Sequence, residues 1–323
     1  METLLLSAPV ADAARERRLL ELGVATVRCG QLRLDSDEAF IGQVHGHAYV
    51  VSGPGRWSEA VFSALKGSLR LAVKFGVGVD NFDLAAATRA GIAVANAPGS
   101  NAEAVAEHTV ALILALLRRI GQAASGIRQG HWQLQCDTLI GKTVGLLGYG
   151  QIARQVAAFL GGFPLALLAH DIRPGESGPA QRVVSVGLDE LLARSDVISL
   201  HLPLTEKTRN MVDAAFLARM KRGAYLVNTA RGGLVSEFDL VNALREGQLG
   251  GAGLDTFATE PLPLSSPLLG LDNVILTPHC ASNTEQAYRS ILACCLDNII
   301  AFKTGCGDAH VLNPDYAKHL VSE

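Results

Sequence analysis

Short apolar runs alternate with helical patterns along most of this 323-residue chain. Such alternation is typical of a parallel sheet with helices packed on its faces. Helical patterns in the first hundred residues include Trp57–Lys66 and Leu84–Ala90. The apolar runs of the same region predict five strands, at Leu4–Ala8, Ala25–Cys29, Ala48–Ser52, Arg70–Phe75 and Ile92–Ala97.

A turn-forming run, Asn96–Ser100, ends this first series, because proline and glycine there cannot continue a strand. A long helix is predicted over Ala102–Arg119, with an acidic start and a basic end that suit the helix dipole. The last helix is predicted over Glu285–Phe302. Between these helices the apolar runs predict a second set of strands, at Thr143–Gly148, Leu165–Asp171, Val197–Pro203, Ala224–Ala230, Gly253–Phe257 and Val274–His279.

The pattern therefore predicts an α/β protein with two doubly wound parallel-sheet domains. A chain of this length exceeds what one hydrophobic core usually organises, which also favours two domains. We place the boundaries near Asn101 and Asn283.

Composition narrows the functional classes. Hydrophobic residues make up 49% of the chain and charged residues 18%, as in a packed globular protein. The net charge of −3, without a long basic run, argues against nucleic-acid binding. The first residues lack the basic flank of a signal peptide, and the longest apolar stretch, Val110–Leu117, is too short to span a membrane. We expect a cytoplasmic protein whose six cysteines form neither disulfides nor a metal site.

A nucleotide-binding motif follows the strand predicted at Thr143. The motif is Gly-x-Gly-x-x-Ala, and it leads from a strand into a helix. Gly148 permits the tight turn, Gly150 lets the backbone approach a pyrophosphate, and Ala153 allows close packing of helix and strand. The N–H groups at the helix start can then bind phosphate oxygens.

Asp171 lies at the end of the next predicted strand, about twenty residues after Gly150. A carboxylate there accepts hydrogen bonds from ribose hydroxyls and repels a 2′-phosphate, which favours NAD over NADP. Arg173 could neutralise part of that repulsion. The ordinary alternative is that the glycines form a simple turn and Asp171 caps a loop.

Three polar residues follow successive strands of the second series: Arg231, Glu260 and His279. Carboxyl ends of parallel strands share one edge of a sheet, where ligands bind. Reduction of a ketone needs an acid for the carbonyl oxygen, which a histidine can supply. A carboxylate can orient that histidine, and an arginine can bind a substrate carboxylate through two hydrogen bonds.

Each of the three residues alone also has an ordinary structural interpretation, and their joint occurrence carries the inference. The sequence has no Gly-x-Ser-x-Gly motif, which argues against a serine hydrolase. Four other histidines lack such partners in the sequence and are interpreted on that ground as structural, namely His108, His131, His170 and His201.

The chain resembles the D-isomer-specific 2-hydroxyacid dehydrogenase family over nearly its whole length. The resemblance rests on a set of short motifs, at Lys74–Asn81, Asn96–Asn101, Ala106–Thr109, Gly145–Gly150, His201–Thr205, Val227–Gly232, Leu254–Phe257 with Glu260-Pro261, and Thr277–His279.

This resemblance implies roles for individual residues. Arg231, Glu260 and His279 match the catalytic residues of the family. The backbone at Val77 and Gly78 would bind the substrate carboxylate beside Lys74 and Asn101, with Arg231 and His279 also contacting substrate. The cofactor contacts that we expect are at Gly148, Gly150, Gln151, Ile152, Asp171, His201, Pro203, Thr208, Thr229, Ala230, Arg231, Asp255 (at the nicotinamide carboxamide) and His279.

The resemblance also implies a discontinuous, flavodoxin-like substrate domain, 1–100 with 284–323, and a Rossmann cofactor domain, 101–283. It further implies a homodimer formed through the cofactor domain. Glutamate rather than glutamine at Glu260 disfavours formate as substrate, and the absence of sequence beyond residue 323 disfavours the long, serine-inhibited phosphoglycerate dehydrogenases.

Several questions remain open at the level of sequence. Lys74 is either a second cation for the substrate or a solvated lysine at a strand end. Arg56 and Trp57 lie where a substrate-facing loop is expected, although surface packing of Trp57 is equally plausible. Phosphite oxidation, and an NAD(H)-binding regulatory protein of the corepressor type, are the alternatives to a small 2-oxo or 2-hydroxy acid dehydrogenase.

Overall fold

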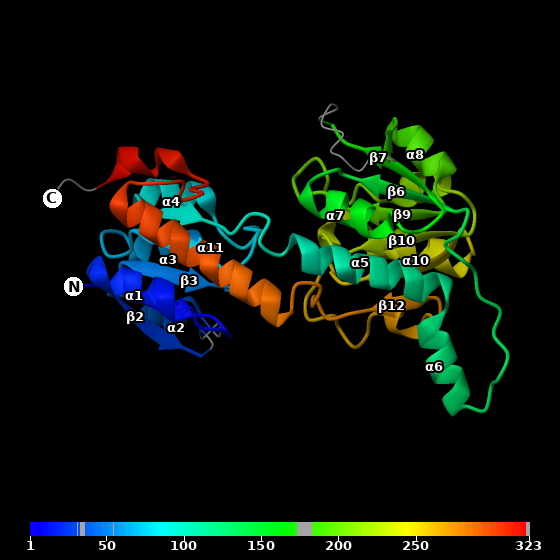
Figure 1. Ribbon diagram of the computed structural model, residues 1–323, viewed down its shortest axis with the longest axis horizontal. Coiled ribbons are helices and arrows are strands. Elements are labelled where there is room, and N and C mark those ends of the chain that lie inside the picture. The colour runs from blue at the N-terminus through cyan, green and yellow to red at the C-terminus, as the bar shows by residue number, and fades with distance from the viewer. Residues whose placement is uncertain (31, 33–35, 54, 173–182, 321–323) are drawn as a thin grey trace. The chain divides into compact units, whose positions relative to one another are not determined.

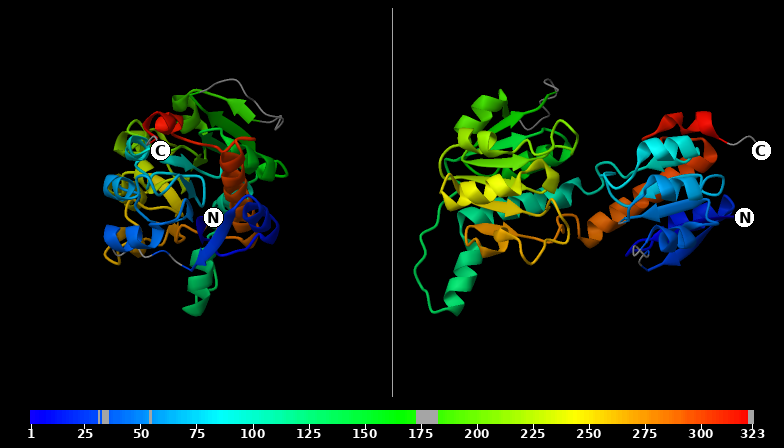
Figure 2. Two further views of the ribbon diagram at one scale, coloured as in Figure 1. Left: turned by 90° about the vertical axis from the view of Figure 1, so that its left-hand side faces the viewer. Right: turned by 180° about the vertical axis from the view of Figure 1, so that it is seen from behind.

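The computed structural model describes the chain except for residues 31, 33–35, 54, 173–182 and 321–323. Arg173, discussed above, lies outside the described residues, and so does Pro54 in the expected substrate-facing loop. The chain divides into two compact units. Unit 1 comprises Met1–Asn101 with Asn283–Glu323, and unit 2 comprises Ala102–Ser282. Each is a parallel sheet covered by helices, which confirms the predicted fold class (Figures 1 and 2).

Unit 1 contains a five-stranded parallel sheet in the order β2-β1-β3-β4-β5, which is the flavodoxin-like order. Its strands are β1 (Glu2–Ser7), β2 (Val24–Cys29), β3 (Tyr49–Ser52), β4 (Leu71–Lys74) and β5 (Ala93–Ala95). Its helices are α1 (Ala13–Glu21), α2 (Asp37–Val44), α3 (Glu59–Ala64), α4 (Leu84–Ala90), α11 (Glu285–Thr304) and the 3-10 helix η3 (Pro314–His319).

Alternating side chains of this sheet form two cores. On one face, Leu5 and Val50 pack with side chains of α2, α3 and α4. On the other, Leu4 and Val51 pack with side chains of α1 and α11. Burial on both faces explains why the strands are continuous apolar runs rather than alternating ones. Because α11 supplies one of these layers, the carboxyl-terminal segment completes unit 1.

Unit 2 contains a seven-stranded parallel sheet in the order β12-β11-β10-β9-β6-β7-β8. Counted from β6, this is the strand order of a Rossmann fold with one added strand. The order reverses between β6 and β9, which is where ligands bind in such sheets. The strands are β6 (Thr143–Leu147), β7 (Ala166–His170), β8 (Val183–Ser185), β9 (Val197–Leu200), β10 (Ala224–Asn228), β11 (Leu249–Leu254) and β12 (Val274–Leu276).

Helices cover both faces of this sheet as well. On one face, side chains of α5 (Ala102–Leu117) and α7 (Gln151–Leu160) form a core with β6. On the other, α8 (Leu188–Arg194), α9 (Ala214–Arg219) and α10 (Glu237–Arg245) form a second core. The remaining helices are α6 (Ile120–Arg128) and the 3-10 helices η1 (Gly232–Leu234) and η2 (Pro267–Gly270).

Some predicted boundaries were wrong. The helix predicted to reach Arg119 ends at Leu117, so its expected basic last turn lies outside α5. Arg119 takes a φ of 50° and α6 begins directly after it. The strand predicted at Gly253–Phe257 is β11, which begins at Leu249 and ends at Leu254. Side-chain periodicity locates the core of an element better than its ends.

The interpretation of Trp57 as a side chain packed on the surface was also wrong. The side chain is 1% exposed, stacks on Phe82 at 5.2 Å between ring centroids, and meets Phe40 edge-on at 5.0 Å. Trp57 is therefore part of the core of unit 1. Arg56, its neighbour, is exposed.

No single helix in the described part of the chain is long and apolar enough to cross a membrane. Within the described residues, α5 and α6 taken together reach that length and apolar character, but they are bent by 56° at their junction. Much of α5 is buried in the core of unit 2.

Candidate functional site

The glycine motif forms the turn between β6 and α7, at the reversal of strand order. Gly148 has a φ of +87°, and a Cβ there would lie 2.5 Å from the carbonyl oxygen of His201. Gly150 caps α7 without a side chain, and a Cβ there would meet no described atom within 4 Å. Gly148 is thus required by the fold, whereas the space beside Gly150 is open. These features fit the pyrophosphate of a dinucleotide, which needs close approach to backbone N–H groups.

Asp171 follows β7, as predicted, and lies next to this turn. Its Oδ2 accepts a hydrogen bond from the backbone N–H of Tyr149 at 2.8 Å. The carboxylate therefore fixes the glycine turn to the end of the neighbouring strand. This position suits a contact with the ribose of a bound dinucleotide.

The residues that follow β9 lie at the same edge of the sheet as the glycine turn. The ring nitrogen Nε2 of His201 is buried without a hydrogen-bond partner, although the residue as a whole is only partly buried. Burial lowers the pKa of His201 to about 4, so its ring is neutral near pH 7. Thr208 donates from its hydroxyl to the carbonyl of Pro203 at 2.8 Å and closes the following turn.

The loop after β10 carries Arg231. Asn228 stabilises this loop, since its amide donates to the carbonyl of Arg231 at 2.8 Å and its oxygen accepts from Ala230 N–H at 3.0 Å. Gly232 lies so close to the backbone at Phe257 that an added Cβ would be 1.9 Å from a carbonyl carbon. This close packing holds the loop of Arg231 against the segment that leads to Glu260.

His279 and Glu260 form a hydrogen-bonded pair. His279 Nδ1 lies 2.7 Å from Glu260 Oε2, and Glu260 Oε1 accepts from the N–H of Phe257 at 2.9 Å. Both carboxylate oxygens are therefore engaged, which fixes the carboxylate and with it the imidazole ring. Because Nδ1 faces Glu260, proton exchange with a ligand falls to Nε2. The side chain of His279 is 49% exposed, so a ligand can reach it.

Asp255 fixes the backbone that carries His279. Its buried carboxylate accepts hydrogen bonds from the N–H groups of Cys280 (2.9 Å) and Ala281 (3.0 Å) and from the hydroxyl of Thr277 (2.6 Å). His279 itself has a φ of 50°, a left-handed conformation that is uncommon for residues other than glycine. Asp255 thus holds the turn on both sides of the histidine.

Two neighbours of Asp255 were missed in the sequence. His108, interpreted above as structural, reaches from α5, with its Nε2 3.0 Å from Thr277 Oγ1 and 3.6 Å from Asp255 Oδ1. Cys280 follows His279 directly. Thr109, also on α5, shares a 2.8 Å hydrogen bond with the buried Thr229. The motif that contains His108 and Thr109 was noted, but nothing in it indicates which strand ends they meet.

The expected substrate contacts at Lys74, Val77, Gly78 and Asn101 belong to unit 1. Lys74 ends β4 and its ammonium donates to the carbonyl of Gly53 and, at 3.3 Å, to Asn81 Oδ1. The solvated alternative for Lys74 is therefore wrong, because the residue is half-buried and hydrogen-bonded. The carbonyl of Val77 accepts from the Asn96 amide at 2.6 Å.

Comparison with known proteins identifies the family of this chain. Residues 110–281 match the model of the NAD binding domain of D-isomer specific 2-hydroxyacid dehydrogenases. A glyoxylate reductase of Korarchaeum cryptofilum is 40% identical over 77% of this chain and 78% of its own. A D-3-phosphoglycerate dehydrogenase of Mycobacterium leprae is 42% identical over 71% of this chain, which spans only 44% of that longer protein. The crystal structure of a glyoxylate reductase from Paecilomyes thermophila superimposes with a TM-score of 0.84, at 30% identity, covering 96% of this chain and 97% of that one.

A Rossmann unit with a glycine turn at the reversal of strand order, matched by the NAD binding domain model over residues 110–281, defines an NAD-dependent dehydrogenase. The chain belongs to the D-isomer specific 2-hydroxyacid dehydrogenase family. It is an NAD-dependent D-2-hydroxyacid dehydrogenase.

Proposed function

We propose that this enzyme reduces a small 2-oxo acid of the glyoxylate type to the D-2-hydroxy acid, with His279 as proton donor, Glu260 as its orienting partner and Arg231 as the carboxylate-binding residue. The observation that carries the proposal is the His279–Glu260 hydrogen bond. It lies at the strand ends of the sheet that also carries the glycine turn.

His279 acts as the acid of the forward reaction. When bound, NADH supplies the hydride that reaches C2 of the substrate. His279 Nε2 donates a proton to the carbonyl oxygen, which would otherwise become an alkoxide. Glu260 holds the ring through its hydrogen bond to Nδ1, which leaves Nε2 directed to the substrate. In the reverse direction the neutral ring accepts the hydroxyl proton.

Arg231 supplies the positive charge for the substrate carboxylate. A guanidinium can form two parallel hydrogen bonds to a carboxylate, which orients the adjacent carbonyl as well as binding the acid. The loop is fixed through Asn228 and Gly232, so the guanidinium has a restricted range of positions. Its Nη1 also donates to the carbonyl of Ala230 at 2.7 Å.

The cofactor contacts proposed for unit 2 line one edge of its sheet. The backbone at Gly148 and Gly150 and at the start of α7 would bind the pyrophosphate, and Asp171 the ribose. The other proposed contacts come from the ends of β9, β10, β11 and β12 and from the turn after β9, namely His201, Pro203, Thr208, Thr229, Ala230, Arg231, Asp255 and His279. In unit 1, the assignment of Lys74, Val77, Gly78 and Asn101 to the substrate stays a prediction.

The glyoxylate type of substrate is favoured by the relatives. Two of the three proteins compared above are glyoxylate reductases, and this chain spans most of the length of each. The phosphoglycerate dehydrogenase is 42% identical over the region that it shares with this chain, so a phosphorylated 2-oxo acid is the comparison substrate in the test below.

A turnover panel tests this function. Purified protein with NADH is given glyoxylate, pyruvate, hydroxypyruvate or 3-phosphohydroxypyruvate, and loss of NADH absorbance is followed. We expect the highest kcat/KM with glyoxylate or hydroxypyruvate and the lowest with the phosphorylated acid. NADH binding without turnover of any acid, or turnover of phosphite with NAD⁺ alone, would contradict the proposal.

A further inference from the structure

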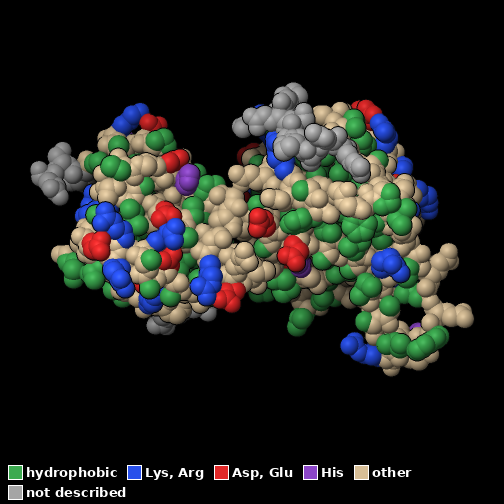
Figure 3. Space-filling view, in the orientation of Figure 1, with side chains coloured by type: hydrophobic (Ala, Val, Ile, Leu, Met, Phe, Trp, Pro, Cys, Tyr) green, Lys and Arg blue, Asp and Glu red, His purple; other side chains and the backbone are tan. Residues whose placement is uncertain are grey.

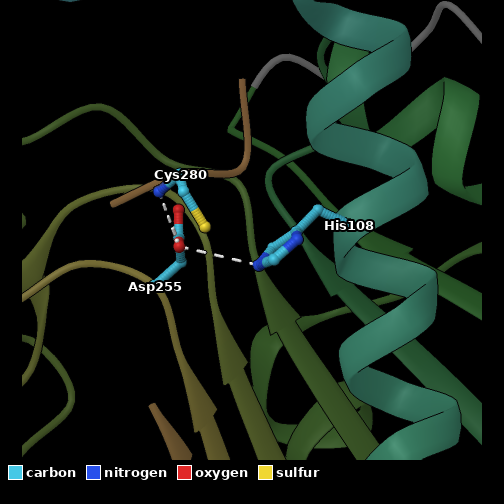
Figure 4. A group of neighbouring side chains, drawn as sticks. All are labelled: His108, Asp255 and Cys280. Carbon is cyan, nitrogen blue, oxygen red and sulfur yellow. Dashed lines mark hydrogen bonds and ion pairs between the residues drawn. The ribbon is translucent and has the colours of Figure 1, made fainter. Parts of the chain in front are cut away.

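A group of three potential metal ligands lies inside unit 2, beside the turn of His279. It consists of His108 from α5, Asp255 after β11 and Cys280 after β12, and one ligand atom of each lies within 4.8 Å of the other two. Figure 4 shows the imidazole of His108 and the thiol of Cys280 both pointing toward the carboxylate of Asp255. Nothing in the dehydrogenase reaction proposed above requires this combination of nitrogen, oxygen and sulfur.

We propose that His108, Asp255 and Cys280 form a binding site for a thiophilic divalent cation, with Zn²⁺ as the best fit. Imidazole, carboxylate and thiolate are the three ligand types that zinc prefers in proteins. Two ligands on a tetrahedral zinc ion lie about 3.5 Å apart, given metal–ligand bonds of about 2.0–2.3 Å. The distance of 3.6 Å between His108 Nε2 and Asp255 Oδ1 already matches this separation.

The site is pre-organised by its surroundings. The buried carboxylate of Asp255 is oriented by the N–H groups of Cys280 and Ala281 and by the hydroxyl of Thr277. Hydrogen bonds that orient a ligand usually strengthen a metal site. One of these donors is the backbone N–H of Cys280 itself. The same contacts therefore also fix the backbone from which the thiol side chain extends.

Charge balance favours a divalent ion. The carboxylate of Asp255 and the thiolate of Cys280 together carry two negative charges, and neutral His108 adds none, so a divalent cation leaves the group neutral around the buried Asp255. Binding deprotonates the thiol and releases one proton to water. It also requires the tautomer of His108 in which Nδ1 carries the proton, because Nε2 must offer its lone pair. The 3.0 Å hydrogen bond from Nε2 to Thr277 Oγ1 in the metal-free protein is therefore replaced by the bond to the metal.

Three protein ligands leave one position of a tetrahedral ion open to water or another ligand. The side chain of His108 is 22% exposed, which provides a route of entry.

Asp255 is also the residue expected at the nicotinamide carboxamide. Occupation of the site should therefore inhibit the enzyme in competition with NADH, a consequence that rests on the proposed function, whereas the metal site itself does not.

Cobalt binding tests the site without any measurement of turnover. The full-length, reduced protein, freed of metal and nucleotide, is titrated with Co²⁺ and its absorption spectrum is recorded. We expect one Co²⁺ per chain, a thiolate-to-cobalt charge-transfer band in the near ultraviolet, and loss of that band when Zn²⁺ is added.

Variants assign the ligands. Cys280→Ala should abolish the charge-transfer band, and His108→Gln, which keeps the thiol, should weaken Co²⁺ binding at least tenfold. Matched controls are Cys136→Ala and Cys306→Ala, which remove exposed thiols elsewhere and should leave the spectrum unchanged. Absence of a thiolate band in the wild-type protein, its persistence in Cys280→Ala, or unchanged affinity in His108→Gln would each overturn the proposal. Circular dichroism of each variant establishes that it is folded.

Discussion

At the scale of single residues, Asp171 combines a structural and a chemical role. Its carboxylate accepts a hydrogen bond from Tyr149 N–H and places a negative charge where a 2′-phosphate of NADP would lie. Asp171→Asn retains an acceptor oxygen but removes the charge. We expect the ratio of kcat/KM for NADPH to that for NADH to rise on the order of tenfold, since repulsion of this kind amounts to about 1–2 kcal/mol in water.

Asp171→Ala separates the two roles. It should show the same change in cofactor preference but, unlike Asp171→Asn, a lower melting temperature, because the N–H of Tyr149 loses its partner. Steady-state kinetics with both cofactors and thermal unfolding without ligand make the comparison. An unaltered preference in both variants would show that other groups select the cofactor.

The same scale shows what sequence reasoning could reach. The contact between Glu260 and His279 was predictable, because each follows a strand of one parallel sheet and their chemistry is complementary. The approach of His108 to Asp255 was not, because helix periodicity indicates which face of α5 is buried but not the strand end that it meets. These motifs likewise do not indicate which 2-oxo acid is the substrate.

At the scale of elements, the turn from β6 to α7 depends on two glycines for different reasons. Gly148 has a positive φ and almost touches the carbonyl of His201, whereas Gly150 has an ordinary φ and open space around it. Gly148→Ala should therefore destabilise the protein by about 2 kcal/mol or more, through backbone strain and steric overlap. Thermal or urea unfolding of the ligand-free protein measures this effect.

Gly150→Ala is the matched variant. It should leave the unfolding of the ligand-free protein unchanged but weaken NADH binding roughly tenfold or more, because the added methyl group occupies the space of the pyrophosphate. Fluorescence titration with NADH provides the dissociation constant. If Gly150→Ala binds NADH as the wild type does, the dinucleotide does not approach this turn as proposed.

Strand positions and sheet class were predictable at this scale because strands buried on both faces are continuous apolar runs. The short strand β8 and helix α6 were missed. Two of the three residues of β8 are exposed, so Val183–Ser185 has little apolar signal. The helix predicted before it ended at Arg119 and no element was predicted at α6, none of whose residues is buried.

At the scale of the whole molecule, the extension formed by α6 and the segment after it indicates where two chains could meet. This extension protrudes from the body of unit 2 (Figure 2), and apolar side chains are visible at its tip (Figure 3). Several of its apolar side chains are more than half exposed, namely Ile120, Ile127, Trp132 and Ile140. Contiguous exposed apolar surface is typical of protein–protein interfaces. We therefore propose that the predicted homodimer forms through this extension.

Charge substitution in the extension tests the dimer. The double variant Ile127→Glu and Trp132→Glu should shift the protein from dimer to monomer in light scattering coupled to size-exclusion chromatography. The matched control is Phe238→Glu, because Phe238 is 76% exposed on α10 of the same unit, outside the extension. A wild-type monomer, or a double variant that remains dimeric, would contradict the proposed interface.

The central claim is that His279 delivers the proton when a 2-oxo acid is reduced. The most direct test compares NADH oxidation with glyoxylate by the wild type, His279→Gln and the control His131→Gln, which changes an exposed histidine after α6. We predict that His279→Gln lowers kcat by a factor on the order of 10² or more while NADH affinity stays within about twofold, and that His131→Gln behaves as the wild type. Unchanged kcat in His279→Gln would contradict the account.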